Sequence, residues 1–324
     1  MGKGAGVVAG LSDDATLAEQ FEHAEEVSGA RPEDAEVVYK NILSVAIAGA
    51  PASEEDDEAG TVVESSIYKL GRLYADAGRH ADLTALMSQI RPFFDTIPKA
   101  KTAKIVRTIL DMAAEIEGEE AQQMLIKLCE ESIEWCKQEK RSFLRQRIEF
   151  RLASLFLDAA NYAASTKIIN PLLREVKRLD DKALLVEIQL LEARVNNCLR
   201  NNPKCRASLT SARTTANGIY VPPLLQAEID MMAGILHADE KDYKTAYSYF
   251  FEAFEGFNTM DDKRAVSNLK YMLLCKIMTS NAEDVQSIVN NKSALRCTPT
   301  APIPFSPSQD CNSRAGVGLA RPWG

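Results

Sequence analysis

The sequence contains few of the residues, and none of the motifs, on which common enzyme sites depend. Only three of its 324 residues are histidine. It has no GxxxxGK[ST], GxSxG or HExxH motif, which argues against a P-loop nucleotide site, a serine hydrolase and a zinc protease. The histidines, His23, His80 and His237, lie more than fifty residues apart. We therefore expect no catalytic residue, no metal site and no cofactor, and we interpret His80 and His237 as surface or packing residues.

The sequence also lacks a long apolar run and a close cysteine pair. No stretch approaches the length of a membrane span, and MGKGAGVVAG has no apolar segment of secretory length. Gly6 stands where a myristoylation signal has Ser or Thr. None of the seven cysteines forms a CxxC pair, so we expect buried thiols outside any disulfide, in a reducing compartment. These features predict a protein that does not associate with membranes.

Charge is distributed unevenly along the chain. The net charge is −8, and residues 1–60 contribute fourteen Asp or Glu against three Lys or Arg. The nearly neutral remainder argues against nucleic acid as a partner. One basic stretch, residues 137–151, places its arginines on shared helix faces: Arg141 with Arg145, and Arg147 with Arg151. We interpret it as a solvated or partner-facing helix edge, with RNA binding as the alternative.

Self-similarity is the strongest signal in the sequence. LGRLYADAGRHADLTALM from Leu70, LASLFLDAANYAASTKII from Leu152 and MAGILHADEKDYKTAYSYF from Met232 follow one plan. Fainter copies begin at Leu110, Leu191 and Met272, so the anchors are spaced by 40, 42, 39, 41 and 40 residues. The period and the scarcity of alternating β-branched runs predict an all-α fold, a right-handed αα-superhelix of TPR-like helical hairpins.

Each repeat unit reads as a helix, a short polar turn and a second helix. The turns are expected at Gly78, Gly118, Asn161, residues 201–203, Asp239 and Asn281. A small residue after the anchor allows close helix approach, and a large apolar residue four positions after the anchor covers the same face. The predicted core therefore includes Leu70, Gly71, Tyr74, Leu152, Ala153, Phe156, Met232, Ala233 and Leu236.

The segment DEKDYKTAYSYFFEAFEGF, residues 239–257, holds seven of the 22 aromatic residues. At 100° per residue most of them share one broad face, so we expect a helix whose rings build the core. The predicted core residues on this face are Tyr243, Tyr247, Phe250, Phe251, Phe254 and Phe257. Tyr249 alone points into the charged face, which makes it a possible partner contact.

Composition divides the chain into three regions. Residues 1–10 are expected to be a flexible N-terminus, and residues 11–296 a helical-repeat solenoid with an acidic loop at 50–60. Residues 297–324 hold five of the thirteen prolines and no periodic apolar face, which predicts a disordered tail.

Several segments carry a resemblance to a known family. KRSFLRQRIEFRLASLF, DDKALLVEIQLLEARV, TSARTTAN and AYSYFFEAFEG resemble the non-ATPase scaffold subunits of the 26S proteasome regulatory lid, a PCI-domain family. The likeness runs from about residue 64 to Leu295, and residues 230–296 resemble the start of the PCI region. After Leu295 the sequence departs from the family pattern, which continues with a winged-helix module.

The resemblance implies a non-enzymatic scaffold in the cytoplasm and nucleus. Its implied partners are other lid subunits, an ATPase of the base and the α-ring of the core particle, in the degradation of ubiquitinated proteins. Two alternatives stay open. One is a scaffold of the signalosome or translation-factor type, with a possible association with RNA. The other is a truncated product that is not incorporated into a complex.

Overall fold

The computed structural model describes residues 16–29, 31–48, 57–95, 97–116 and 118–279, together with Val285 and Ile288. Within these residues the regular structure comprises thirteen α-helices and a short 3-10 helix, with no strand. The predicted all-α fold of helical hairpins is therefore confirmed. The predicted tail 297–324, the N-terminal residues 1–10 and residues 50–56 of the predicted acidic loop lie outside the described residues. The last four residues of that predicted loop, 57–60, are helical, because α3 begins at Asp57.

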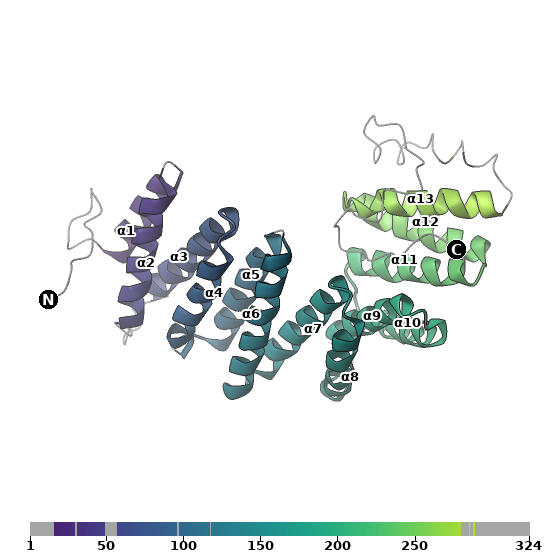
Figure 1. Cartoon of the computed structure of the whole chain (residues 1–324), viewed down its shortest axis with the longest axis horizontal. Coiled ribbons are helices and arrows are strands. Elements are labelled where there is room, and N and C mark those ends of the chain that lie inside the picture. The colour runs from purple at the N-terminus through teal and green to yellow at the C-terminus, as the bar shows by residue number, and fades with distance from the viewer. Residues whose placement is uncertain are drawn as a thin grey trace. The chain divides into compact units, whose positions relative to one another are not determined.

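The chain divides into two compact units, residues 1–148 and 149–324. The helices of the first unit are α1 (Leu17–Ser28), α2 (Pro32–Ala48), α3 (Asp57–Asp76), α4 (His80–Gln89), α5 (Lys99–Glu115) and α6 (Glu119–Gln138). The 3-10 helix η2 (Arg91–Asp95) follows α4. Each hairpin packs on the next: α3 contacts α2, α4 and α5, and α6 contacts α4 and α5. Figure 1 shows these hairpins following one another along the unit.

The boundary between the units falls within α7 (Ser142–Asp158). The second unit continues with α8 (Tyr162–Leu179), α9 (Lys182–Cys198), α10 (Asn202–Ala216), α11 (Pro223–Asp239), α12 (Tyr243–Thr259) and α13 (Arg264–Met278). Here α9 contacts α8, α10 and α11, and α12 contacts α11 and α13. The same pattern of stacked hairpins therefore builds both units.

Among the turns between α6 and α13, all except the α10–α11 connection contain a residue in the left-handed conformation. Residues 140, 160, 180, 200, 241 and 261 all have φ between 52° and 67°. At Ala160, the N–H of this residue donates to the Leu157 carbonyl (3.0 Å) and the next N–H, of Asn161, donates to the Phe156 carbonyl (2.8 Å). This pair of hydrogen bonds closes the helix in a Schellman motif. Asn161 then caps α8 by accepting from the N–H of Ala164.

Asp or Asn recurs after these left-handed residues and starts the next helix. Asp181, Asn201 and Asp242 accept hydrogen bonds from the N–H groups three positions on, in the manner of Asn161. Two predicted turn positions shift by one or two residues as a result. Residues 202 and 203 already belong to α10, and Asp239 is the last residue of α11. The remaining predicted turn, at residue 281, lies outside the described residues.

Most of the predicted core is buried. The buried members are Leu70, Gly71, Tyr74, Leu152, Ala153, Met232, Ala233, Leu236, Phe250, Phe254 and Phe257. Tyr243 and Tyr247 are half-buried and pack against the core of α9–α13. Two residues predicted to lie in the core, Phe156 and Phe251, are not buried. Phe156 is only half-buried because Leu157 fills the buried position, and the Phe251 side chain is 37% exposed.

Small residues let the paired helices approach closely. In α11, a Cβ at Gly234 would lie 2.7–3.0 Å from three ring atoms of Phe250 in α12. The Phe250 ring is 1% exposed and stacks on Tyr271 with 5.1 Å between ring centroids. In the hairpin α7–α8, the buried carbonyl of Ala153 accepts a hydrogen bond from Ser165 at 2.8 Å. Close contact therefore occurs at the position after Ala233 and at Ala153 itself.

Candidate functional site: charged clamps between successive hairpins

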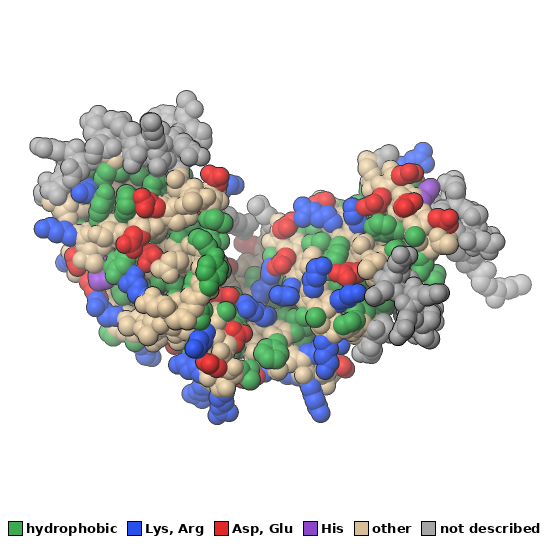
Figure 2. All heavy atoms as spheres, turned by 180° about the vertical axis from the view of Figure 1, so that it is seen from behind, with side chains coloured by type: hydrophobic (Ala, Val, Ile, Leu, Met, Phe, Trp, Pro, Cys, Tyr) green, Lys and Arg blue, Asp and Glu red, His purple; other side chains and the backbone are tan. Residues whose placement is uncertain are grey.

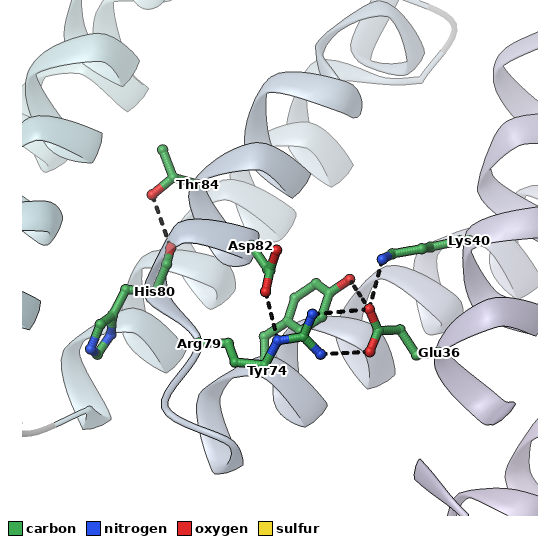
Figure 3. Close-up of polar contacts among 7 residues, drawn as sticks. All are labelled: Glu36, Lys40, Tyr74, Arg79, His80, Asp82 and Thr84. Carbon is green, nitrogen blue, oxygen red and sulfur yellow. Dashed lines mark hydrogen bonds and ion pairs between the residues drawn. The ribbon is translucent and has the colours of Figure 1, made fainter. Parts of the chain in front are cut away.

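A cluster of charged groups joins the hairpin α1–α2 to the turn between α3 and α4 (Figure 3). The Glu36 carboxylate in α2 accepts hydrogen bonds from Lys40 Nζ (2.6 Å), Tyr74 Oη (3.1 Å) and Arg79 Nη1 (2.7 Å). The Arg79 guanidinium also donates through Nε to Asp82 Oδ2 (2.6 Å). Its carbon lies 5.0 Å from the centroid of the Tyr74 ring. Arg79 therefore links three helices through one planar group.

The local sequence positions each member of this cluster. Tyr74 is the apolar residue four positions after the anchor Leu70, so its ring is buried and its hydroxyl emerges at the edge of the core. Arg79 follows the left-handed Gly78 (φ 65°), and its N–H donates to the Tyr74 carbonyl at 2.9 Å. This turn aims the guanidinium back towards α2. In Figure 3 the His80 ring points away from the cluster.

The electrostatics of the cluster favour the ionised carboxylate. Burial by itself raises the pKa of Glu36, but hydrogen bonds from Arg79, Lys40 and Tyr74 together outweigh burial and hold that pKa below its ordinary value. Burial raises the pKa of Tyr74, so the phenol stays protonated and donates. All four groups are thus paired, and none is available as a general base or nucleophile.

A second cluster joins α10, α11 and α12. Arg213 donates to Asp230 Oδ1 (2.8 Å) and to the Tyr249 hydroxyl (2.8 Å), and its guanidinium carbon lies 4.5 Å from the Tyr249 ring centroid. Gln226 donates to the other oxygen of Asp230 (2.9 Å). The His237 ring stacks on the Tyr249 ring, with 5.4 Å between the ring centroids. The Asp230 side chain is only 7% exposed, so its two donors compensate a buried charge.

The geometry corrects the expectation for Tyr249. This side chain is half-buried, packs against the core of α9–α13 and makes contacts with Arg213 and His237. The charged face of α12 instead carries the neighbouring aromatic residue, Phe251. A partner contact of Tyr249 stays a prediction, but the side chain already holds three helices together.

Charged contacts recur between hairpins at a spacing close to the repeat length. The hydrogen-bonded pairs Arg79–Glu36, Lys104–Glu64, Arg72–Glu115, Arg206–Glu240, Arg213–Tyr249 and Arg264–Glu228 are separated by 34 to 43 residues. Equivalent positions of successive hairpins lie side by side, so a residue meets its partner one repeat away. An exposed ion pair contributes only about 0–1 kcal/mol. We therefore interpret these clamps as setting the register between hairpins.

The predicted arginine edge is divided among different environments. Arg141 precedes α7, and its guanidinium lies 4.8 Å from the Trp135 ring and donates to the Phe94 carbonyl (3.2 Å). It is therefore part of the packing beside α6, and the expectation that it shares a helix face with Arg145 is wrong. Arg145, Arg147 and Arg151 lie in α7 and are half-buried. A partner contact of these three residues stays a prediction.

The described part of the chain contains no candidate metal centre. Among these residues, no group of three or more His, Cys, Asp or Glu side chains is placed to hold a metal ion. A cavity lined by α4, α5 and α6, with His80 at its edge, has a volume of about 10 Å³, which is room for about one water molecule. None of the described helices has the length and apolar character needed to cross a membrane.

The cysteines of the described residues behave as expected for thiols in a helical core. Cys129, Cys136, Cys205 and Cys275 are buried and Cys198 is half-buried, and none forms a disulfide within the described residues. Burial raises the pKa of Cys205 to about 12 and that of Cys275 to about 11. These thiols are protonated at neutral pH, which argues against a role as nucleophiles.

Stacked hairpins, charged clamps at repeat spacing and a solid core define a helical-repeat scaffold, a class of protein that acts through its surfaces. Comparison with solved structures agrees on the fold alone. A Rap protein crystallised with competence and sporulation factor matches with a TM-score of 0.53 and 11% identity, over 87% of this chain and 76% of the Rap chain.

Sequence comparison identifies the family. Residues 17–159 match the model of the 26S proteasome regulatory subunit RPN6 N-terminal domain. The chain is 54% identical over 239 residues to a 26S proteasome non-ATPase regulatory subunit 11 homolog of Arabidopsis thaliana, covering 74% of this chain and 57% of the relative. The Dictyostelium discoideum subunit 11 is 48% identical, over 80% and 60% of the two chains. RPN6 of Saccharomyces cerevisiae is 41% identical, over 80% and 61%.

These matches confirm the resemblance found in the sequence. The chain spans roughly three fifths of the length of these curated relatives, between 57% and 61%.

Proposed function

We propose that this chain is a non-catalytic scaffold subunit of the 26S proteasome lid. In this role its helical hairpins link the lid to an ATPase of the base and to the α-ring of the core particle, and support assembly for the degradation of ubiquitinated proteins. The observation that carries the proposal is the homology to RPN6 and non-ATPase regulatory subunit 11 at 41–54% identity.

The geometry supports a scaffold over an enzyme. The ionisable groups that come together, such as Glu36 with Arg79 and Asp230 with Arg213, hold helices in register and are saturated by hydrogen bonds. Within each unit, stacked hairpins present a surface whose contacts are spaced by the repeat. We also propose the cytoplasm and the nucleus as its location, because the proposed complex acts in both.

Reconstitution tests the proposal directly. The 324-residue chain, carrying an affinity tag, is mixed with separately purified lid subunits, base and core particle, and the complexes are resolved on native gels. We expect recovery of lid subunits together with base or core subunits. An unrelated helical-repeat protein with the same tag is the control. Recovery no greater than this control would refute the proposed assembly role.

The RNA-associated alternative has its own outcome. Its motivation was the arginine edge, but the Arg141 guanidinium is already engaged by Trp135 and the Phe94 carbonyl. Binding of RNA that is abolished by Arg145→Ala or Arg147→Ala, without recovery of proteasome subunits, would favour that alternative. Imaging of a fluorescent fusion tests the proposed location, and exclusion from either compartment would contradict it.

A further inference from the structure

One exposed face of α8 is strongly basic. Lys167, Arg174 and Arg178 follow one another at intervals of seven and four residues, so they lie on one stripe of the helix. Lys177 lies beside this stripe, and Lys182 begins the next helix. All five side chains are exposed. From Lys167 to Arg178 the stripe is about 16 Å long at 1.5 Å per residue. We name these five residues the α8 basic face.

Lys and Arg side chains gather at the lower edge of the surface in Figure 2, where Figure 1 places the end of α8. None of the five cations of the α8 basic face makes an ion pair or a hydrogen bond through its side chain with any residue that the structure describes. The nearest acidic residue in sequence is Glu175 of α8, which follows Arg174, is half-buried and is engaged in an interaction of its own. Asp180 and Asp181 lie in the turn after α8. Asp181 is occupied as the cap of α9, where it accepts from the N–H of Leu184 at 3.1 Å.

Several arginines at other positions of this chain are engaged by acidic residues. Arg79 is bound by Glu36 and Asp82, Arg206 by Glu240, and Arg264 by Glu228 and Asp262. These arginines clamp one hairpin to the next. The α8 basic face has no such use within the described residues, so its charges are available to another molecule.

Helix stability does not account for the α8 basic face. Lys177 and Arg178 lie in the last turn of α8, where cations interact favourably with the helix dipole. Lys167 and Arg174 lie outside that turn, and the dipole disfavours Lys182 at the first position of α9. Arg174 and Arg178 form a like-charged pair four residues apart, which is destabilising by about 0.2–0.5 kcal/mol.

The surroundings of the cations indicate the chemistry of the partner. Leu179 ends α8 beside Arg178 with its side chain 47% exposed, which adds an apolar contact to the basic stripe. The aromatic residue of α8, Tyr162, is half-buried and packs against the core. The face therefore has no exposed ring on which a base of single-stranded nucleic acid would stack.

We propose that the α8 basic face is a docking surface for an acidic segment of a partner protein, whose carboxylates pair with Lys167, Arg174 and Arg178 and whose apolar side chain packs on Leu179. The proposal goes beyond the scaffold function and does not depend on it, because it rests on charge and exposure alone. Charge complementarity raises the rate at which the acidic segment associates with the face, and the contact with Leu179 fixes the position of one end of the bound segment.

Fluorescence anisotropy with the full chain tests the docking surface. The probe is a short fluorescein-labelled peptide of Glu and Asp residues with two leucines, and the variant combines Lys167→Glu, Arg174→Glu and Arg178→Glu. The control combines Lys99→Glu, Lys127→Glu and Lys244→Glu, which changes the net charge equally at other exposed positions. We expect the α8 variant to weaken binding about tenfold, because three attractions become repulsions, and the control to weaken it less than threefold.

Further readouts keep the test decisive if the triple variant unfolds. Circular dichroism checks that its helix content is unchanged, and the mild substitutions Arg174→Gln and Leu179→Ser, made singly, must each weaken binding. Equal weakening by the α8 and control variants would overturn the proposal, as would no measurable binding at low salt. A labelled oligouridine that binds through the same residues more tightly than the peptide would also overturn it, in favour of nucleic acid.

Discussion

Replacing Gly234 by alanine should destabilise the second unit, although alanine is the better helix former. Alanine contributes about 1 kcal/mol more than glycine to the stability of a helix interior. The new Cβ, however, would lie 2.7, 2.8 and 3.0 Å from three atoms of the Phe250 ring. That ring is 1% exposed and stacked on Tyr271, so it has no free space into which to move. Overpacking of this kind costs about 1–3 kcal/mol.

We therefore expect a net loss of up to about 2 kcal/mol in the free energy of unfolding. Gly60→Ala is the matched control, because nothing lies within 4 Å of a Cβ at this position of α3, and it should stabilise the chain. Gly256→Ala should lie between the two, since its Cβ meets only the Ala227 side chain closely, at 2.9 Å.

Amide hydrogen exchange is the appropriate assay because the two units need not unfold together. The exchange of amides in α11 and α12 reports the opening of the second unit, and that of α3 reports the first. Gly234→Ala should accelerate exchange in α11 and α12, whereas Gly60→Ala should slow it in α3. Unchanged or slower exchange for Gly234→Ala would show that α11 and α12 separate easily, and that the close approach is not a constraint.

Three further substitutions test the clamps and α8. The pKa of Glu36 is held below its ordinary value of 4.5, so its charge stabilises the folded chain above that pH, and this stabilisation is lost as pH falls through the lower folded-state pKa. Glu36→Gln should therefore lower the urea midpoint at pH 7 and leave it equal to that of the wild type in acid. An equal difference at both pH values would contradict the clamp. Arg213→Ala leaves the buried Asp230 carboxylate short of a donor and should cost about 2–3 kcal/mol in thermal unfolding, whereas adding Asp230→Asn should restore part of the loss; no recovery would mean that the pair is not coupled. Pro171 lies inside α8 without an N–H to donate, so Pro171→Ala should raise stability by about 1–3 kcal/mol, and a lower melting temperature would show that the proline suits this position.

The repeat of about forty residues predicted the helices well, because the same positions of each repeat are buried. The anchors Leu70, Leu152 and Met232 are buried, and the turns near Gly78, Gly118 and Asn161 lie where the small and polar residues suggested. The left-handed residues at 140, 160, 200 and 241 were missed because Lys, Ala and Arg carry no preference for positive φ. Asn or Asp follows five of the six left-handed residues, and this was the signal that could have located the turns.

Details that depend on neighbouring helices could not be predicted. The face of α12 was assigned from its own residues, and the contribution of Arg213 from α10 could not enter, so Tyr249 was placed in solvent and Phe251 in the core. Arg141 was read as part of a helix that begins one residue later. The clamps themselves were missed for the same reason, although acidic and basic residues one repeat apart were visible in the sequence.

The spacing of the clamps has a consequence for how the chain folds. The hydrogen-bonded pairs named above as clamps span 34 to 43 residues, so each of them joins segments about one repeat apart. At a synthesis rate of about 5–20 residues per second, the partner of a new hairpin emerges about 2–8 s after it. Each repeat can therefore pack on the preceding repeat during synthesis. Contacts between residues this close in sequence favour rapid folding.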